Sequence, residues 1–94
     1  MSVEVVLPGV LADLAGGSRH VEVDGPGGGT LADLLDTLGA VHPRLARRIR
    51  DEAGALRRFV NVYVDGDDVR FAGGLGAPVP DGAVVQVLPS VAGG

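Results

Sequence analysis

The stretch FVNVYVDGDDVRF, residues 59–71, predicts two strands that pair around a tight turn. β-branched and aromatic residues dominate Phe59 to Val64, and such residues favour strands. Asp65-Gly66 is typical of a two-residue hairpin turn, which needs residues that tolerate a positive φ. We therefore expect Val69 to Phe71 to pair back on the strand that precedes the turn.

A further strand is predicted after Pro80-Asp81-Gly82, a turn in which Pro fixes φ, Asp bonds locally and Gly accepts a positive φ. The run that follows, Ala83 to Leu88, is mostly apolar. Such a run is typical of a strand covered on both faces, so we expect it to lie in the centre of its sheet.

Two strands are also predicted near the N-terminus. Val3 to Leu7 shows the alternation of a strand until Pro8-Gly9 interrupts it, and Arg19 to Val23 alternates again. The segment between them contains Leu11, Leu14 and two glycines, and we expect it to connect the two strands as a hairpin.

A helix is predicted in the middle of the chain, after a glycine-rich loop at Gly25 to Gly29. Thr30 is a candidate N-cap, with Asp33 three residues later in a capping-box position. Four leucines then share one helix face: Leu31, Leu34, Leu35 and Leu38. We expect Gly39 to end this helix and Pro43 to begin a second, short helix that continues to about Arg50.

This order of elements predicts an α+β fold of the β-grasp (ubiquitin-like) kind. One main helix packs on one face of a mixed sheet of four to five strands, with the first and last strands side by side in the centre. The predicted domain covers residues 1–88, and residues 89–94 form a flexible tail. The leucines of the helix should be buried against six valines: Val3, Val5, Val60, Val62, Val85 and Val87.

Composition excludes several classes of function. With 94 residues the chain forms one domain, and its net charge of −4 argues against binding to nucleic acid. The absence of Cys excludes disulfides, thiolate nucleophiles and thiol–metal sites, and the two histidines are too isolated to form a metal site. Without a membrane-spanning apolar run or a signal peptide, we expect a cytoplasmic protein.

The end of the sequence is the strongest candidate for chemistry. After Leu88 it reads Pro-Ser-Val-Ala-Gly-Gly, ending at Gly94. We expect Pro89 to stop the sheet ladder, and six extended residues can reach about 20 Å. Small residues such as Gly93, Ala92 and Val91 suit a segment that threads a narrow channel in another protein. A diglycine end alone is also what a frayed terminus would show.

The chain resembles the MoaD/ThiS sulfur-carrier family. Residues 59–71 are similar to the third and fourth strands of that family, and residues 81–94 to its final strand and tail. The form that this motif takes at residues 58–61 and 69–75 is most similar to the CysO-type carriers of actinobacteria. Ser90 departs from the Ala that the family pattern would place there. The close resemblance covers residues 57–94, whereas residues 1–56 match in the order of their elements.

The resemblance implies that the chain is a carrier and not an enzyme. It would bind no cofactor. An ATP-dependent, ubiquitin-activating-like enzyme would adenylate the carboxylate of Gly94, and a sulfur donor would convert it to a thiocarboxylate. A sulfur-accepting synthase would then take the sulfur. In CysO-type systems the acceptor is an aminoacrylate on pyridoxal phosphate, and a zinc peptidase releases the cysteine that is formed.

A partner must hold the body of the carrier while the tail enters its active site. We expect the docking surface on the sheet face away from the helix, with Phe59, Phe71 and Arg58 as candidate anchors. Four more arginines could form a docking patch for an acidic partner or a solvated helix face: Arg44, Arg47, Arg48 and Arg50. The chain has no Lys, which reflects codon bias or disfavours self-conjugation.

Three functions remain open from the sequence. The first is a sulfur carrier for cysteine biosynthesis or for a thio-containing natural product. The second is the small subunit of molybdopterin synthase, which uses the same chemistry. The third, from another class, is a ubiquitin-like protein modifier or binding module without sulfur chemistry.

Overall fold

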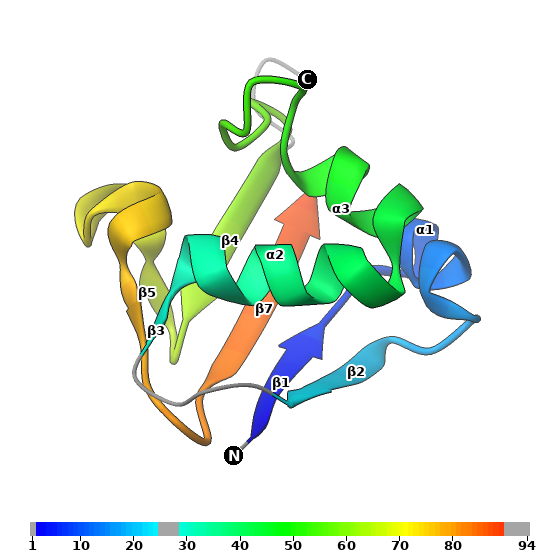
Figure 1. The fold of residues 1–94 in the computed structure, drawn as a ribbon, viewed down its shortest axis with the longest axis horizontal. Coiled ribbons are helices and arrows are strands. Elements are labelled where there is room, and N and C mark those ends of the chain that lie inside the picture. Colours follow the sequence, from blue (N-terminus) through cyan, green and yellow to red (C-terminus); the bar gives the residue numbers. More distant parts are fainter. Residues whose placement is uncertain (1, 25–28, 90–94) are drawn as a thin grey trace.

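A five-stranded sheet in the order β2-β1-β7-β4-β5 forms the body of the protein (Figure 1). The computed structural model describes residues 2–24 and 29–89. The bounds of the sheet strands are β1 Ser2–Val6, β2 His20–Asp24, β4 Val60–Val64, β5 Asp67–Asp68 and β7 Val84–Pro89. A separate two-stranded ribbon pairs β3 (Gly29–Thr30) with β6 (Pro78–Val79).

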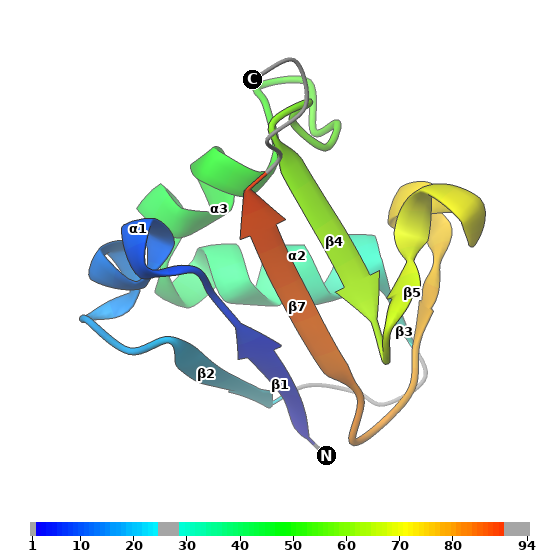
Figure 2. The same cartoon turned by 180° about the vertical axis from the view of Figure 1, so that it is seen from behind.

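α2 and α3 lie on one face of this sheet, and no described helix covers the other face (Figures 1 and 2). The α-helices are α1 Gly9–Ala12, α2 Leu31–Val41 and α3 Pro43–Ile49, and the 3₁₀ helices are η1 Asp13–Ala15, η2 Val69–Phe71 and η3 Gly74–Gly76. β1 runs parallel to β7 and antiparallel to β2, while β4 runs antiparallel to β7. The α+β, β-grasp prediction is confirmed, including the first and last strands side by side.

The core is the predicted helix-on-sheet contact. All four leucines of α2 are buried, and Leu31, Leu35 and Leu38 are at most 1% exposed. Five of the six predicted valines are buried with them, and Val3 is partly buried against the same cluster. The hairpin turn is confirmed as well, since Asp65 and Gly66 both have a positive φ, of 49° and 89°.

The two ends of α2 show one correct and one wrong prediction. Thr30 and Asp33 form the predicted capping box: the Asp33 amide donates to Thr30 Oγ1 at 3.3 Å, and the Thr30 amide donates to Asp33 Oδ2 at 3.1 Å. Gly39 does not end the helix, which continues to Val41. A Cβ at Gly39 would lie 3.2 Å from the Cβ of Ala46, so this glycine permits close packing of α2 on α3. The residue before Pro43 ends the helix instead, because proline disfavours helical backbone at the preceding position.

The predicted strand at Val69 to Phe71 is wrong: these residues form the 3₁₀ helix η2, and β5 is limited to Asp67–Asp68. The Asp68 side chain accepts a hydrogen bond from the Arg70 amide at 2.9 Å, and the Ala72 amide donates to the Val69 carbonyl at 3.0 Å. These local bonds replace a cross-strand ladder.

β7 is central, as predicted, but two details differ. Its residues alternate, so Val85 and Val87 are buried while Val84 and Leu88 are 37% and 43% exposed on the open face. Pro89 does not stop the ladder; it is the last residue of β7 and pairs with Val60. The body therefore extends one residue beyond the predicted boundary at 88.

The register of β7 explains why proline is accepted at its end. The Asp65 amide bonds the Val84 carbonyl at 2.8 Å, so hydrogen-bonded pairs recur at every second residue and Val60–Pro89 falls between them. The nitrogen of Pro89 therefore points to the other side of β7, where β1 has ended at Val6. The missing N–H costs no ladder hydrogen bond there.

The link between β1 and β2 contains α1 and η1, which the sequence patterns did not indicate. Ala12 and Ala15 are buried, and Leu11 and Leu14 pack against the core. The spacing of Leu7 and Leu11, four residues apart, was the available signal for a helical turn.

Candidate functional site

β7 is the last described element before the predicted sulfur-carrying end in the chain. Pairing with Val60 fixes the position of Pro89, whose side chain is exposed. The tail residues named from the sequence, Gly94, Gly93, Ala92 and Val91, lie outside the described residues. The structure describes the surface around Pro89, the last described residue before this tail.

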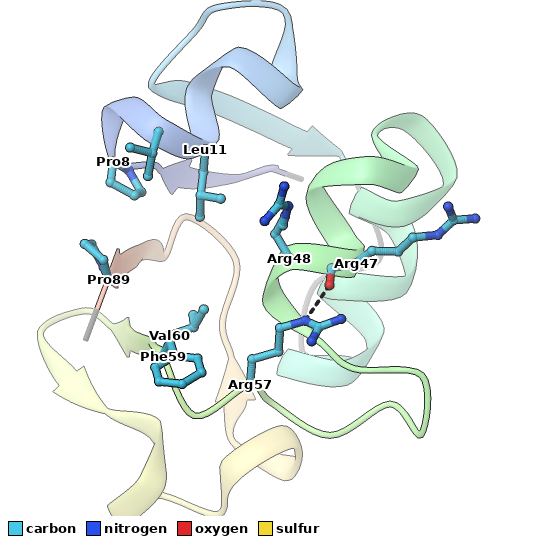
Figure 3. A pocket seen from close by; sticks show the side chains of 9 residues that line it. Pro8, Leu11, Arg47, Arg48, Arg57, Phe59, Val60 and Pro89 are labelled. Carbon is cyan, nitrogen blue, oxygen red and sulfur yellow. Dashed lines mark hydrogen bonds between the residues drawn. The ribbon is translucent and has the colours of Figure 1, made fainter. Parts of the chain in front are cut away.

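A groove of about 480 Å³ opens at this end of the sheet (Figure 3). Its walls come from α1, α3, the segment before β4 and the end of β7. The lining residues are Pro8, Val10, Leu11, Arg47, Arg48, Arg57, Phe59, Val60 and Pro89. Apolar side chains therefore form much of the surface, and every charged residue in the lining is an arginine.

The arginines of the groove differ in their roles. Arg57 Nε donates a hydrogen bond to the Arg47 carbonyl at 2.6 Å, which ties the segment before β4 to α3. The Arg47 side chain points away from the groove, Arg48 extends toward Leu11, and the Arg57 guanidinium is directed at the Arg47 carbonyl (Figure 3). The ion pairs among the described residues lie elsewhere, at Arg50–Asp36 and His20–Glu4. The guanidinium groups of Arg48 and Arg57 thus meet no carboxylate within residues 2–24 and 29–89.

The three predicted docking residues are all exposed, but the structure does not bring them all into one site. Phe59 is 72% exposed and lines the groove beside Pro89. Phe71 is 91% exposed and lies on η2, outside the groove lining. Arg58 is exposed and is not among the lining residues.

Arg70 connects η2 to this end of the sheet, a role that the sequence did not indicate. Its guanidinium donates to the carbonyl of Val60 at 3.1 Å; Val60 is the first residue of β4 and follows Phe59 directly. No local spacing pattern points to this contact, because it depends on the 3₁₀ turn of η2.

The four arginines on α3 and at its C-terminal end do not form one patch. Arg48 faces the groove, Arg44 is exposed and outside its lining, and the Arg50 guanidinium lies 2.7 Å from Asp36 Oδ1. Part of the set therefore fits a docking patch, and part supports the packing of α3 on α2.

The described residues hold no group of three or more His, Asp or Glu side chains arranged for a metal ion. None of the helices described is long and apolar enough to span a bilayer. A second hollow, on the open sheet face, is lined by Ser2, Glu4, His20, Glu22, Gly82 and Val84. Its polar side chains are partly paired with one another, since His20 Nδ1 contacts Glu4 Oε2.

A family model, described as the ThiS family, matches residues 5–94. The chain belongs to the ThiS family. Sulfur carrier protein CysO of Mycobacterium tuberculosis is 41% identical over 96 residues that cover 100% of both chains. Small archaeal modifier protein 1 of Haloferax volcanii is 38% identical over 87 residues, which cover 90% of this chain and 95% of that protein.

Solved structures of ThiS-family relatives share the fold described above. The crystal structure of M. tuberculosis CysO matches with a TM-score of 0.85 and 38% identity, covering 95% of this chain and 99% of that one. A chain in the crystal structure of the Amycolatopsis orientalis BexX/CysO complex matches with a TM-score of 0.81 and 42% identity, covering 98% and 99%. The resemblance to CysO-type carriers that the sequence indicated is confirmed.

Proposed function

We propose that this chain carries sulfur as a thiocarboxylate on Gly94 and donates it in a partner enzyme, for cysteine biosynthesis or for a thio-containing natural product. The observation that supports this most directly is the 41% identity to sulfur carrier protein CysO over the full length of both chains. Residues 90–94 would serve as the segment that enters the active sites of partners, while the body that ends at Pro89 serves as the handle.

The chemistry proceeds in two steps at the Gly94 carboxylate. A carboxylate oxygen attacks the α-phosphorus of ATP in an activating enzyme, so that pyrophosphate leaves and an acyl-adenylate forms. The sulfur of a sulfide-equivalent donor then attacks the carbonyl carbon, AMP leaves with the C–O electron pair, and the thiocarboxylate remains. The carrier contributes its end group and its docking surface, and the partners contribute the catalytic groups and ATP.

Sulfur delivery completes the proposed cycle. The thiocarboxylate is an anionic nucleophile, which a sulfur-accepting synthase would position against an electrophile. For a CysO-type pathway this electrophile is an aminoacrylate on pyridoxal phosphate, and a zinc peptidase would release the cysteine. The absence of Cys from the chain supports the proposal, because no internal thiol can capture the activated acyl group.

Phe59, Phe71 and Arg58 remain the proposed anchors for these partners. Their support in the structure is exposure: both aromatic rings are more than 70% exposed, which is unusual for phenylalanine in a body of this size. A partner that covers them would bury apolar area that the free carrier leaves in water.

A second candidate is a protein modifier, supported by the 38% identity to small archaeal modifier protein 1. In this case the activated Gly94 carbonyl would be attacked by an amine of a target protein, and AMP would leave as an isopeptide bond forms. Both candidates share the adenylation step and differ in the nucleophile that follows it.

Adenylation is tested by ATP–pyrophosphate exchange with the activating enzyme of the same host. Deleting Gly94 moves the carboxylate by about 3.3 Å, a large displacement where reacting atoms must approach to about 3–3.5 Å, so we expect loss of exchange. Gly93→Val should be nearly as damaging, because a branched side chain would meet the channel wall. Ser90→Ala, which restores the family residue, is the matched control and should exchange like the wild type. Full exchange by the Gly94 deletion would refute the proposal.

Intact mass analysis of the chain isolated from its host separates the two candidates. A carrier should show one oxygen replaced by sulfur, and a modifier should be found attached to other proteins. Circular dichroism of each tail variant should match that of the wild type, because the altered residues lie beyond β7.

A further inference from the structure

The groove beside Pro89 combines apolar walls with arginine side chains that meet no carboxylate among residues 2–24 and 29–89, in a chain of net charge −4. Leu11, Phe59 and Val60 offer apolar surface, and the Arg48 guanidinium extends beside Leu11 (Figure 3). A groove with this composition matches a peptide segment better than a free anion, since much of its surface gains from burial against apolar atoms. Guanidinium groups recognise carboxylates through two parallel hydrogen bonds.

The position of the groove determines which molecule can cover it. Pro89 lines the groove, and Gly94 is five residues further along the chain. Five extended residues reach about 17 Å at most. An enzyme that acts on Gly94 must therefore place its active site within that distance of Pro89, so its surface lies over or beside the groove.

We propose that the groove receives a segment of the adenylating enzyme in which an acidic residue flanks an apolar side chain. The carboxylate pairs with Arg48, and the apolar side chain packs on Leu11 and Phe59. This inference rests on the proposed function, because it takes the adenylating enzyme as the partner that acts on Gly94. It differs from docking on the open sheet face, since α1 and α3 supply much of the groove.

Arg48 is the residue that tests the contact, because its guanidinium makes no hydrogen bond to another described residue, whereas Arg57 also holds the Arg47 carbonyl. Arg44 supplies the matched control. It lies on the same helix, is exposed and does not line the groove, so Arg44→Glu changes the net charge as much as Arg48→Glu does. Arg48→Lys keeps the charge and loses the forked geometry.

The experiment measures the Kd between the carrier and the adenylating enzyme of the same host by isothermal titration calorimetry, at low and high NaCl. Arg48→Glu should weaken binding by roughly 10-fold or more at low salt, and Arg44→Glu by less than about threefold. The Kd of Arg48→Lys should lie between those of the wild type and Arg48→Glu. The loss caused by Arg48→Glu should shrink at high salt, because salt screens the ion pair.

Several outcomes overturn the inference. One is equal weakening by Arg48→Glu and Arg44→Glu, which would indicate a long-range charge effect; another is an Arg48→Glu variant that binds like the wild type. A wild-type chain that does not bind the enzyme also overturns it. The urea midpoint of each variant must equal that of the wild type, and Arg48→Ala replaces Arg48→Glu if the latter unfolds earlier.

Pyrophosphate exchange and the Kd values of the two arginine variants together separate this inference from the proposed function. If the carrier chemistry is wrong but the groove contact is right, the wild type shows no pyrophosphate exchange while the difference between Arg48→Glu and Arg44→Glu persists. If the chemistry is right and the groove contact is wrong, exchange requires Gly94 and the two arginine variants bind alike. The Gly94 deletion should keep the wild-type Kd within about threefold, because the groove contact does not involve that residue.

Discussion

Replacing Leu35 with Ala tests the packing of α2 on the sheet. Leu35 is 1% exposed and lies in the cluster that joins α2 to β1, β4 and β7. Any loosening of this contact reaches β7, the strand from which the tail continues. The substitution removes apolar atoms without adding a polar group or changing the charge, so its effect reports the packing alone.

The magnitude follows from the burial of the side chain. Leu→Ala removes three carbon atoms, which at about 0.8 kcal/mol each contributes about 2.4 kcal/mol. Incomplete collapse of the cavity adds up to about 2 kcal/mol more, so we expect a loss of about 3–4 kcal/mol. A domain of this length has roughly 5–14 kcal/mol of stability in total, so the variant should remain folded with a greatly reduced margin.

Urea unfolding followed by circular dichroism measures this loss as a lower midpoint at an unchanged slope. Val41→Ala is the matched control, because Val41 lies on the same helix and is 70% exposed. It should change the free energy of unfolding by less than about 0.5 kcal/mol. A loss below about 1 kcal/mol for Leu35→Ala, or equal losses for the two variants, would refute the helix-on-sheet packing.

Three smaller perturbations test other features. Thr30→Ala removes the acceptor for the Asp33 amide and should cost about 1 kcal/mol in urea unfolding, whereas Thr30→Ser should cost little. Asp65→Ala removes the Oδ1 acceptor of the Val84 amide, 2.9 Å away, and leaves a positive φ on Ala; we expect a loss of about 1–3 kcal/mol, and an unchanged midpoint would contradict this. Phe71→Ala should leave unfolding within about 0.5 kcal/mol, because the ring is 91% exposed. If Phe71 is a docking anchor, its removal should weaken binding to the adenylating enzyme by about fivefold or more in the calorimetric assay.

The sequence predicted the elements whose residues face a single environment. The leucines of α2 recur with the helix period because one side of the helix meets the sheet, and the valines of β4 alternate because one face of that strand meets α2. Both patterns arise because every second residue of the strand, or every third to fourth residue of the helix, contacts the same neighbouring element. The two-residue turn at Asp65 was predictable for the same reason, since its backbone requirement is local.

The features that the sequence did not predict depend on contacts between distant segments. Gly39 lies inside α2 and allows Ala46 to pack close to it, and Pro89 is accepted at the end of β7 because β1 has already ended at Val6. The groove combines Leu11, Arg48 and Phe59, which come from three separate parts of the chain. No spacing along the sequence reports such a grouping, whereas the chemistry expected of Gly94 came from a resemblance and not from a local pattern.

The central place of β7 also bears on how the protein assembles during synthesis. β1 and β4 are made before β7, yet each must pair with it, so the sheet cannot close until residues 84–89 are available. Pairing between strands this far apart in the chain is intrinsically slow to form, and until then β1 and β4 each present an unpaired edge. We therefore expect a chain truncated before β7 to aggregate or to be degraded. Because Gly94 follows β7 in the chain, every molecule that carries the Gly94 carboxylate also contains the strand that closes the sheet.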